Sequence, residues 1–325
     1  MNILVTGGAG YVGSALVPRL LDSGYCVTTV DLLIYGADTL PDHPNHKLVK
    51  GDIRDSELLN NLLTGQDAVI HLACISNDPS FDLNPTLGRS INYDAFLPLV
   101  TISKNKNVSR FIYASSSSVY GIQEISSVDE ETKLAPLTDY SKYKGACEEQ
   151  LFAHSDAAFS TVIARPATVC GYSRRQRLDV VVNILTNLAY HKREITVFGG
   201  DQLRPNIHIN DMVAAYLLLL EAPTSDINKQ IFNIGYDNKA VREIAYSVRE
   251  IVGEDVTITT KPTDDHRSYH ISSRKILDRL GFSPQQSIRD AVSDLCAAFD
   301  QGALPESLTD DKYFNIQRMQ NINLQ

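Results

Sequence analysis

The sequence contains few cysteines, no metal-ligand spacing and no internal repeat. Its 325 residues include five scattered cysteines and no CxxC pair. An odd, dispersed set of cysteines predicts free thiols in a reducing compartment rather than a disulfide framework. Because no Cys/His cluster has the spacing of metal ligands, no metal site is expected.

Long hydrophobic runs are also missing. The longest, MVAAYLLLLEA at Met212–Ala222, is far shorter than the roughly 20 apolar residues of a membrane span. The first residues lead into an apolar strand pattern without a basic region before it, so we expect no signal peptide. These features predict a soluble, cytoplasmic protein that does not bind membranes.

The chain has fewer basic than acidic residues, 30 Lys and Arg against 39 Asp and Glu, which gives a formal net charge of −9 at pH 7. Nucleic acid is therefore not expected as a partner, because binding its phosphates requires a basic surface. A small anionic ligand is still compatible with this charge, since a few arginines in one cleft can outweigh the overall sign. The length and the 43% hydrophobic content allow a large core or two unequal domains.

The first 165 residues alternate short β-rich runs with helical stretches. Strands are predicted at Ile3–Thr6, Cys26–Val30, Lys47–Lys50, Ala68–His71, Arg110–Ala114 and Thr161–Ala164. Helices are predicted at Tyr11–Leu21, Ser56–Leu63, Ser90–Lys104 and Asp139–Phe152. This alternation predicts βαβ units, a parallel sheet and right-handed crossovers.

Beyond Ala167 the pattern loosens. Helices are predicted at Asp179–His191, Asn210–Ala222, Ala240–Val252 and Ile288–Phe299, and short strands at Glu194–Phe198, Gln230–Ile234 and Thr257–Thr260. We expect a smaller lobe over the carboxyl edge of the sheet, partly interleaved with it. The polar segment after Gly302 is weakly periodic and is expected to be a poorly ordered tail.

A glycine-rich turn, TGGAGYVG, follows the first strand and opens the first helix. Gly7 would make the tight turn, Gly10 would let the backbone approach a pyrophosphate, and Gly13 would let the helix pack closely. The helix N-terminus offers free N–H groups to the phosphates. Asp31, at the end of the second strand, would bind the adenosine ribose hydroxyls and repel a 2′-phosphate, which favours NAD over NADP.

The fold class is therefore predicted as α/β, with a doubly wound, Rossmann-type parallel sheet and a smaller C-terminal substrate lobe. The NAD-binding domain is expected over residues 1–170, with 203–235 interleaved with it. The substrate lobe is expected over 171–302 and the tail over 303–325.

The GxxGxxG spacing and several later segments resemble the extended short-chain dehydrogenase/reductases, in the NAD-dependent nucleotide-sugar epimerase/dehydratase family. The resemblance runs from TGGAGYVG to LGFSPQQSIRDAV at Leu280–Val292 and includes GDIRD, HLACIS and SINYDAF. It implies further NAD contacts from Tyr11, Val12, Asp52, Ile53, Leu72, Ala73, Ser76 and Asn92.

The segments ASSSSVYG and YSKYK resemble the family's catalytic serine and YxxxK pair, which places these roles on Ser116, Tyr140 and Lys144. Oxidising a sugar alcohol requires a base, and a tyrosine needs a lowered pKa to serve at neutral pH. Lowering it by about 3 units corresponds to roughly 4 kcal/mol, which a nearby ammonium and the positive nicotinamide can supply. Tyr140 and Lys144 are four residues apart and share one helix face.

Each motif taken alone has a simpler interpretation. A lone YxxxK is usually an exposed helical face, and four serines are usually a flexible turn. Their occurrence together after a dinucleotide-binding turn favours catalysis. A non-catalytic NAD-binding protein is disfavoured because Tyr140 and Lys144 are both present.

The two residues after Ser116 separate the possible reactions. Resemblance to the 4,6-dehydratases would require Asp-Glu there, but the sequence has Ser117 and Ser118. The 3,5-epimerase/reductases would have a cysteine where Ser118 stands. The remaining Ser-Tyr-Lys set supports oxidation and reduction at C4, first as a 4-epimerase and second as a 4-dehydrogenase or ketoreductase.

The resemblance places the substrate, a UDP- or GDP-linked sugar, against the second half of the chain. Expected contacts are Ser118, Thr168, Arg177, Arg204 and Arg267, with the last two binding the diphosphate. The basic run Arg174, Arg175 and Arg177 has an alternative interpretation as a solvated loop. The resemblance also implies a homodimer through a four-helix bundle formed by the helices at Ser90–Lys104 and Asp139–Phe152.

Overall fold

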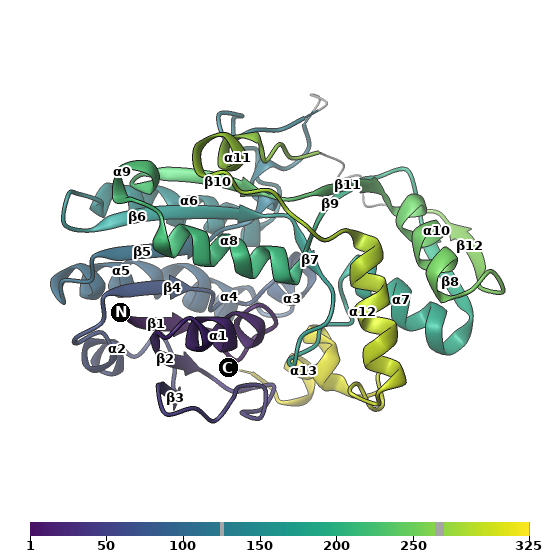
Figure 1. Ribbon diagram of the computed structural model, residues 1–325, viewed down its shortest axis with the longest axis horizontal. Coiled ribbons are helices and arrows are strands. Elements are labelled where there is room, and N and C mark those ends of the chain that lie inside the picture. The colour runs from purple at the N-terminus through teal and green to yellow at the C-terminus, as the bar shows by residue number, and fades with distance from the viewer. Residues whose placement is uncertain (124–126, 264–269, 325) are drawn as a thin grey trace.

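The computed structural model describes residues 1–123, 127–263 and 270–324. Its centre is a seven-stranded parallel sheet in the order β10-β6-β5-β4-β1-β2-β3 (Figure 1). The strands are β1 (Asn2–Thr6), β2 (Cys26–Asp31), β3 (His46–Lys50), β4 (Ala68–His71), β5 (Arg110–Ala114), β6 (Ser160–Pro166) and β10 (Gln230–Ile234). The predicted doubly wound sheet is thus confirmed, and β10 joins it from the second half of the chain.

Helices cover both faces of this sheet because successive side chains of each strand point to opposite faces. Ile3 and Val5 pack with α1 (Gly13–Asp22) and α8 (Ile209–Glu221). Leu4 packs on the other face, with α2 (Ser56–Leu62) and α5 (Phe96–Asn105). That second layer also contains α6 (Asp139–His154), whose Cys147 and Leu151 are fully buried.

The helix predicted at Ser90–Lys104 is divided in the structure. Residues Ser90–Asp94 form a π-helical turn before α5, and two short helices precede it, α3 (Asp78–Asp82) and α4 (Pro85–Arg89). The wider turn coincides with the buried Asn92, whose amide donates to the carbonyl of Ile75 and accepts from its N–H. Such π-turns are frequent at functional sites.

The second lobe has its own apolar core, formed by α7 (Val181–Lys192), α10 (Val241–Val252) and α12 (Ile288–Asp300). These helices pack on a parallel strand pair, β8 (Glu194–Phe198) and β12 (Thr257–Lys261). A small sheet that the sequence did not predict lies between the lobe and the main sheet (Figure 1); it contains β7 (Thr168–Cys170), β9 (Leu203–His208) and β11 (Asp237–Ala240). The short helices α9 (Thr224–Ile227) and α11 (Arg274–Leu280) complete this half.

The expectation of a poorly ordered C-terminal tail is wrong. The last helix, α13 (Asn315–Asn321), lies against α3 beside the main sheet, and Leu304, Tyr313 and Met319 are buried (Figure 1). Weak periodicity concealed this order because the segment is anchored by a few separated apolar side chains and by single polar contacts. Arg318, for example, donates to the carbonyl of Ile34 over 2.7 Å.

All five cysteines are free thiols. Within the described ranges, no group of three or more His, Cys, Asp or Glu side chains is arranged to hold a metal ion. A search of the same ranges finds no helix with the length and apolar character to cross a membrane.

Candidate active site

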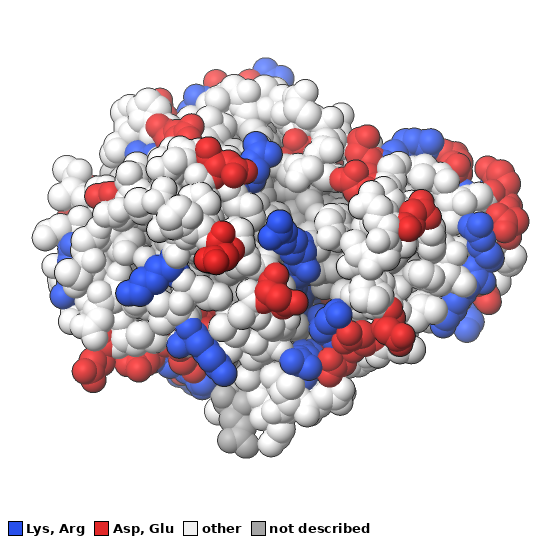
Figure 2. Space-filling view, turned by 60° about the horizontal axis from the view of Figure 1, so that its bottom comes forward, with Lys and Arg blue, Asp and Glu red and all other residues white. Residues whose placement is uncertain are grey.

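A cleft of about 430 Å³ opens where β1, β2, β4 and β5 end at the carboxyl edge of the sheet. It lies at the point where the strand order reverses between β1 and β4, which is where open α/β sheets bind ligands. Figure 2 shows the molecule hollowed between the sheet-bearing body and the smaller lobe, with Lys and Arg side chains along the hollow.

The glycine-rich turn forms one wall of the cleft. Gly7 has a φ of +72°, and a Cβ on it would lie 2.6 Å from the backbone of Ala73 on the neighbouring strand end. A Cβ on Gly13 would lie 2.5 Å from the Cα of Gly8. Both positions therefore require glycine for the turn to close and for α1 to begin where it does.

Asp31 reaches this turn from the end of β2. Its carboxylate accepts hydrogen bonds from the N–H groups of Ala9 (3.0 Å) and Leu33 (2.8 Å). Burial raises the pKa of Asp31, while these two bonds and the charge of Arg175 oppose that rise. The carboxylate is thus fixed at the mouth of the cleft, where the sequence expects the adenosine ribose.

Most residues expected to contact the cofactor line the cleft: Gly7, Gly10, Tyr11, Val12, Gly13, Asp31, Asp52, Ile53, Leu72, Ala73 and Ser76. Asn92 is not among the residues that line the cleft, so a direct contact with the cofactor stays a prediction. Its buried amide is used by both backbone groups of Ile75. Asn92 therefore shapes the loop after β4 from behind.

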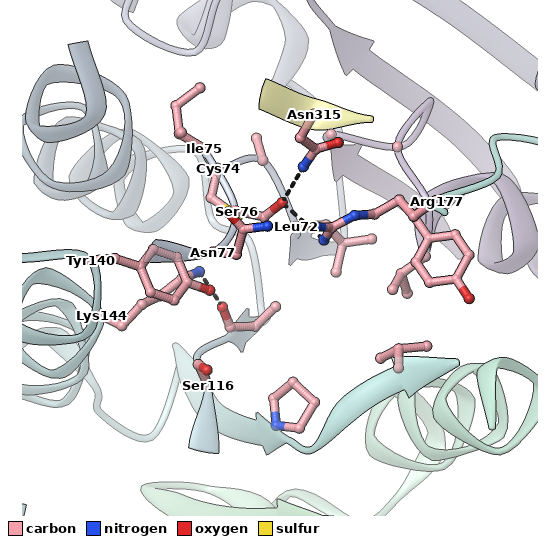
Figure 3. Close-up of a pocket in the computed structure, with 18 of the residues that line it drawn as sticks. Leu72, Cys74, Ile75, Ser76, Asn77, Ser116, Tyr140, Lys144, Arg177 and Asn315 are labelled. Carbon is pink, nitrogen blue, oxygen red and sulfur yellow. Dashed lines mark hydrogen bonds between the residues drawn. The ribbon is translucent and has the colours of Figure 1, made fainter. Parts of the chain in front are cut away.

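Ser116, Tyr140 and Lys144 converge on the cleft from two neighbouring elements (Figure 3). Ser116 follows β5, and Tyr140 and Lys144 lie in the first two turns of α6. Lys144 is only 4% exposed; its ammonium donates to the carbonyl of Ala114 over 2.6 Å and lies 5.9 Å from the centre of the Tyr140 ring. The structure thus brings together the three side chains that the sequence predicted as catalytic.

The surroundings of Tyr140 raise the pKa of its phenol. Burial is the largest cause, followed by the nearby Cys74 and Asp78; Ser116 and Arg177 act in the opposite direction. The sequence predicted a lowered pKa, and the protein groups alone do not produce it. The positive nicotinamide of a bound cofactor would favour the phenolate beside the Lys144 ammonium.

A buried ion pair fixes α6 against the sheet behind these residues. Glu148 on α6 binds Arg165 on β6 through two contacts, of 2.5 and 3.0 Å. The same carboxylate accepts a bond of 2.5 Å from Ser115, the residue before Ser116. One carboxylate therefore connects the helix carrying Tyr140 and Lys144 to the strand end carrying Ser116.

Four of the five residues expected to bind substrate, Ser118, Thr168, Arg177 and Arg204, line the cleft. Arg267 lies outside the described residues. The solvated-loop interpretation is correct for Arg174, which is exposed, and wrong for Arg175 and Arg177. Arg177 pairs with Asp179 at 2.9 Å and donates to Ser76 over 3.2 Å.

Several residues that line the cleft were not predicted from the sequence. Asp78, at the start of α3, accepts a bond of 2.5 Å from Thr138 just before Tyr140. Tyr35 and the C-terminal Asn315 also line the cleft. Only Asp78 had a local signal, the Asn-Asp-Pro start of a helix; the others reach the cleft through tertiary packing.

The geometry can be compared with known proteins. The family model described as "NAD dependent epimerase/dehydratase family" matches residues 3–235 of this chain. The chain belongs to this family. It is therefore an enzyme of the NAD-dependent epimerase/dehydratase class, as the sequence predicted, and NAD is its cofactor.

The similar proteins include some named as 4-epimerases and some named as 4,6-dehydratases. The chain is 28% identical to a UDP-glucose 4-epimerase of Lactobacillus helveticus, covering 90% of this chain and 94% of that one. It is 27% identical to a dTDP-glucose 4,6-dehydratase of Streptomyces niveus, covering 90% of each. A UDP-glucose 4-epimerase structure from Thermotoga maritima, with UDP-glucose, superposes with a TM-score of 0.85 at 27% identity, covering 93% of this chain and 99% of that one.

The structure of MoeE5 in complex with UDP-glucuronic acid and NAD is also similar, with a TM-score of 0.82 at 28% identity, covering 93% of this chain and all of that one. None of these comparisons concerns assembly. The homodimer through α5 and α6 stays a prediction.

Proposed function

We propose that this enzyme is a nucleotide-sugar 4-epimerase, which inverts C4 through a transient 4-keto sugar. The observation that carries the proposal is the convergence of Ser116, Tyr140 and Lys144 at the cleft, with serines at the two positions after Ser116. This set can remove and return one hydroxyl proton, and C4 inversion needs no further acid or base.

Tyr140 is the group that takes the proton from the C4 hydroxyl and gives it back to the same oxygen when hydride returns to the opposite face of C4. Ser116 holds the reacting oxygen, since its hydroxyl lies at the same end of the cleft. Lys144 supplies positive charge beside the phenol and is placed to hold the cofactor ribose. NAD, held by the glycine-rich turn, Asp31 and Lys144, would supply the hydride acceptor and donor for C4.

A 4,6-dehydratase must also remove the C5 proton and protonate the departing C6 hydroxyl. The side chains of Ser117 and Ser118 do not titrate in the range needed for either step. The carboxylate of Asp78 lines the cleft, but it already accepts a hydrogen bond from the Thr138 hydroxyl just before α6. The dehydratase is therefore the weaker candidate, despite relatives that carry that name.

We propose that the substrate's nucleotide diphosphate lies towards Arg204 and the small sheet of β7 and β9. An arginine suits this role because its planar donors pair with phosphate oxygens. A uridine nucleotide is our first choice, because similar solved structures are named for UDP-glucose and UDP-glucuronic acid. A GDP-linked sugar is the second.

The test is incubation of the purified enzyme with UDP- and GDP-linked hexoses and with dTDP-glucose, followed by chromatographic analysis of the sugar. A 4-epimerase produces the C4 epimer catalytically without added oxidant. A 4-dehydrogenase or ketoreductase instead stops after one equivalent with absorbance at 340 nm. Loss of water from dTDP-glucose would replace the proposal with a dehydratase.

A further inference from the structure

A segment of the smaller lobe brings a buried arginine to the cofactor end of the cleft. The side chain of Arg175 lines the cleft, although the residue is only 4% exposed to solvent. Its guanidinium lies 3.6 Å from the centre of the Tyr35 ring and donates to the amide oxygen of Asn315 over 2.5 Å. Within the described ranges it forms no ion pair with a carboxylate.

The same segment is bonded directly to the glycine-rich turn. The Ser173 hydroxyl donates to the carbonyl of Tyr11 over 2.9 Å, and the N–H of Arg175 donates to the hydroxyl of Ser14 over 3.1 Å. The Tyr11 hydroxyl donates back to the carbonyl of Gly171 over 2.6 Å. Arg175 is therefore held in a fixed position relative to the phosphate-binding turn.

Asn315, from the C-terminal segment, connects the arginine to the loop after β4. Its amide nitrogen donates to the Ser76 hydroxyl over 3.0 Å (Figure 3). Its backbone N–H donates to Asp179 over 2.9 Å. Ser76 also accepts from Arg177 over 3.2 Å. One amide thus joins the main sheet, the arginine-bearing segment and the C-terminus at the edge of the cleft.

The charges around this group are incompletely paired. The Nε of Arg175 and one terminal nitrogen of Arg177 are buried without a hydrogen-bond partner. Burial lowers the pKa of Arg175 to about 10, so it keeps its charge at neutral pH. A buried guanidinium with unpaired donors is unfavourable unless an anion supplies acceptors. The charge of Arg175 acts on Asp31, which also lines the cleft, but the carboxylate oxygens of Asp31 already accept from Ala9 and Leu33.

We propose that Arg175 and Arg177, positioned by Asn315, bind the diphosphate of NAD from the side opposite the glycine-rich turn. The diphosphate would then be held between the turn's backbone N–H groups and two guanidiniums. This assigns Arg177 to the cofactor instead of the substrate, and it gives the C-terminal segment a role in cofactor binding. The proposal depends on NAD binding and is independent of the choice between epimerase and dehydrogenase.

The experiment compares two ligands that differ in the diphosphate. The affinities of ADP-ribose and adenosine are measured by calorimetry on NAD-free wild type, Arg175→Gln and Arg177→Gln. Losing a charge-assisted bond to phosphate is expected to weaken ADP-ribose binding about 10- to 100-fold. Adenosine binding should change less than twofold. Equal losses for both ligands, or no loss for ADP-ribose, would overturn the assignment.

Matched variants separate binding from folding. Arg174→Gln changes an exposed arginine of the same segment and should leave ADP-ribose affinity unchanged. Asn315→Ala should weaken ADP-ribose binding less than Arg175→Gln, because it only releases the arginine. Arg175→Lys keeps the charge and should recover part of the affinity even if Arg175→Gln folds poorly. If Arg177→Gln weakens UDP binding while ADP-ribose binding is unchanged, Arg177 belongs to the substrate site.

Discussion

The buried pair of Glu148 and Arg165 should be the most sensitive structural element behind the active site. Their side chains are 5% and 3% exposed, respectively, and Arg165 also donates to the Tyr120 hydroxyl over 2.8 Å. In Glu148→Gln the guanidinium stays buried without its counter-charge. Removing one partner of a buried pair costs about 3–5 kcal/mol, much more than an exposed pair contributes.

This loss predicts a fall in melting temperature of roughly 6–10 °C, using about 2 °C per kcal/mol for a chain of this size. The turnover number should also fall, roughly tenfold, because Glu148 fixes the helix of Tyr140 and Lys144 and the residue before Ser116. Thermal unfolding and urea denaturation measure the loss of stability, and initial rates on the same preparations measure the loss of turnover.

A control variant and a double variant test whether the buried charge causes the loss. Glu149→Gln changes the exposed neighbour on α6 and should alter the free energy of unfolding by less than about 0.5 kcal/mol. The double variant Glu148→Leu with Arg165→Leu should be destabilised by clearly less than the sum of the single variants, since no charge is left buried. Additive losses, or a loss below about 1 kcal/mol for Glu148→Gln, would refute the reasoning.

Three further predictions follow from single contacts. Gly7→Ala should weaken NAD binding at least about tenfold in calorimetry, because a methyl group would meet the backbone of Ala73 at a φ of +72°; wild-type affinity would contradict this. His71, whose pKa burial lowers to about 3, should make wild type lose stability as pH falls below 6.5, by up to about 1.4 kcal/mol per unit, because only the unfolded state takes up the proton. His71→Gln should flatten that slope in urea titrations between pH 6.5 and 4.5, and an unchanged slope would exclude His71 as its source. Asp78→Asn should move the alkaline rise of kcat to lower pH, since the carboxylate raises the pKa of Tyr140; a shift to higher pH would contradict that cause.

The main sheet could be predicted from the sequence because its strands are short apolar runs separated by amphipathic helices. All six strands expected before residue 167 are present; two have the predicted bounds, and the ends of the other four differ by at most two residues. The small sheet of β7, β9 and β11 was missed because its strands carry mixed residues. Segments such as LRPNIH gain their order from pairing with each other rather than from a hydrophobic pattern.

The convergence of Ser116, Tyr140 and Lys144, which we propose as catalytic, could be predicted because each belongs to a local motif: the serine run after β5, and the i, i+4 pair on α6. Asn315 and Arg175 could not. Their positions depend on a C-terminal segment that folds back against the glycine-rich half of the chain, and single hydrogen bonds across such a separation leave no periodic signal. The raised pKa of Tyr140 was also missed, because desolvation depends on packing rather than on the lysine four residues later.

The fate of the hydrogen at C4 tests the central proposal most directly. The enzyme is incubated with UDP-glucose carrying deuterium at C4, and the product sugar is examined by mass spectrometry and NMR. The account predicts that wild type yields the C4 epimer with deuterium retained at C4, and that Tyr140→Phe binds NAD but yields no epimer. Deuterium lost to solvent, or an unchanged rate in Tyr140→Phe, would contradict it.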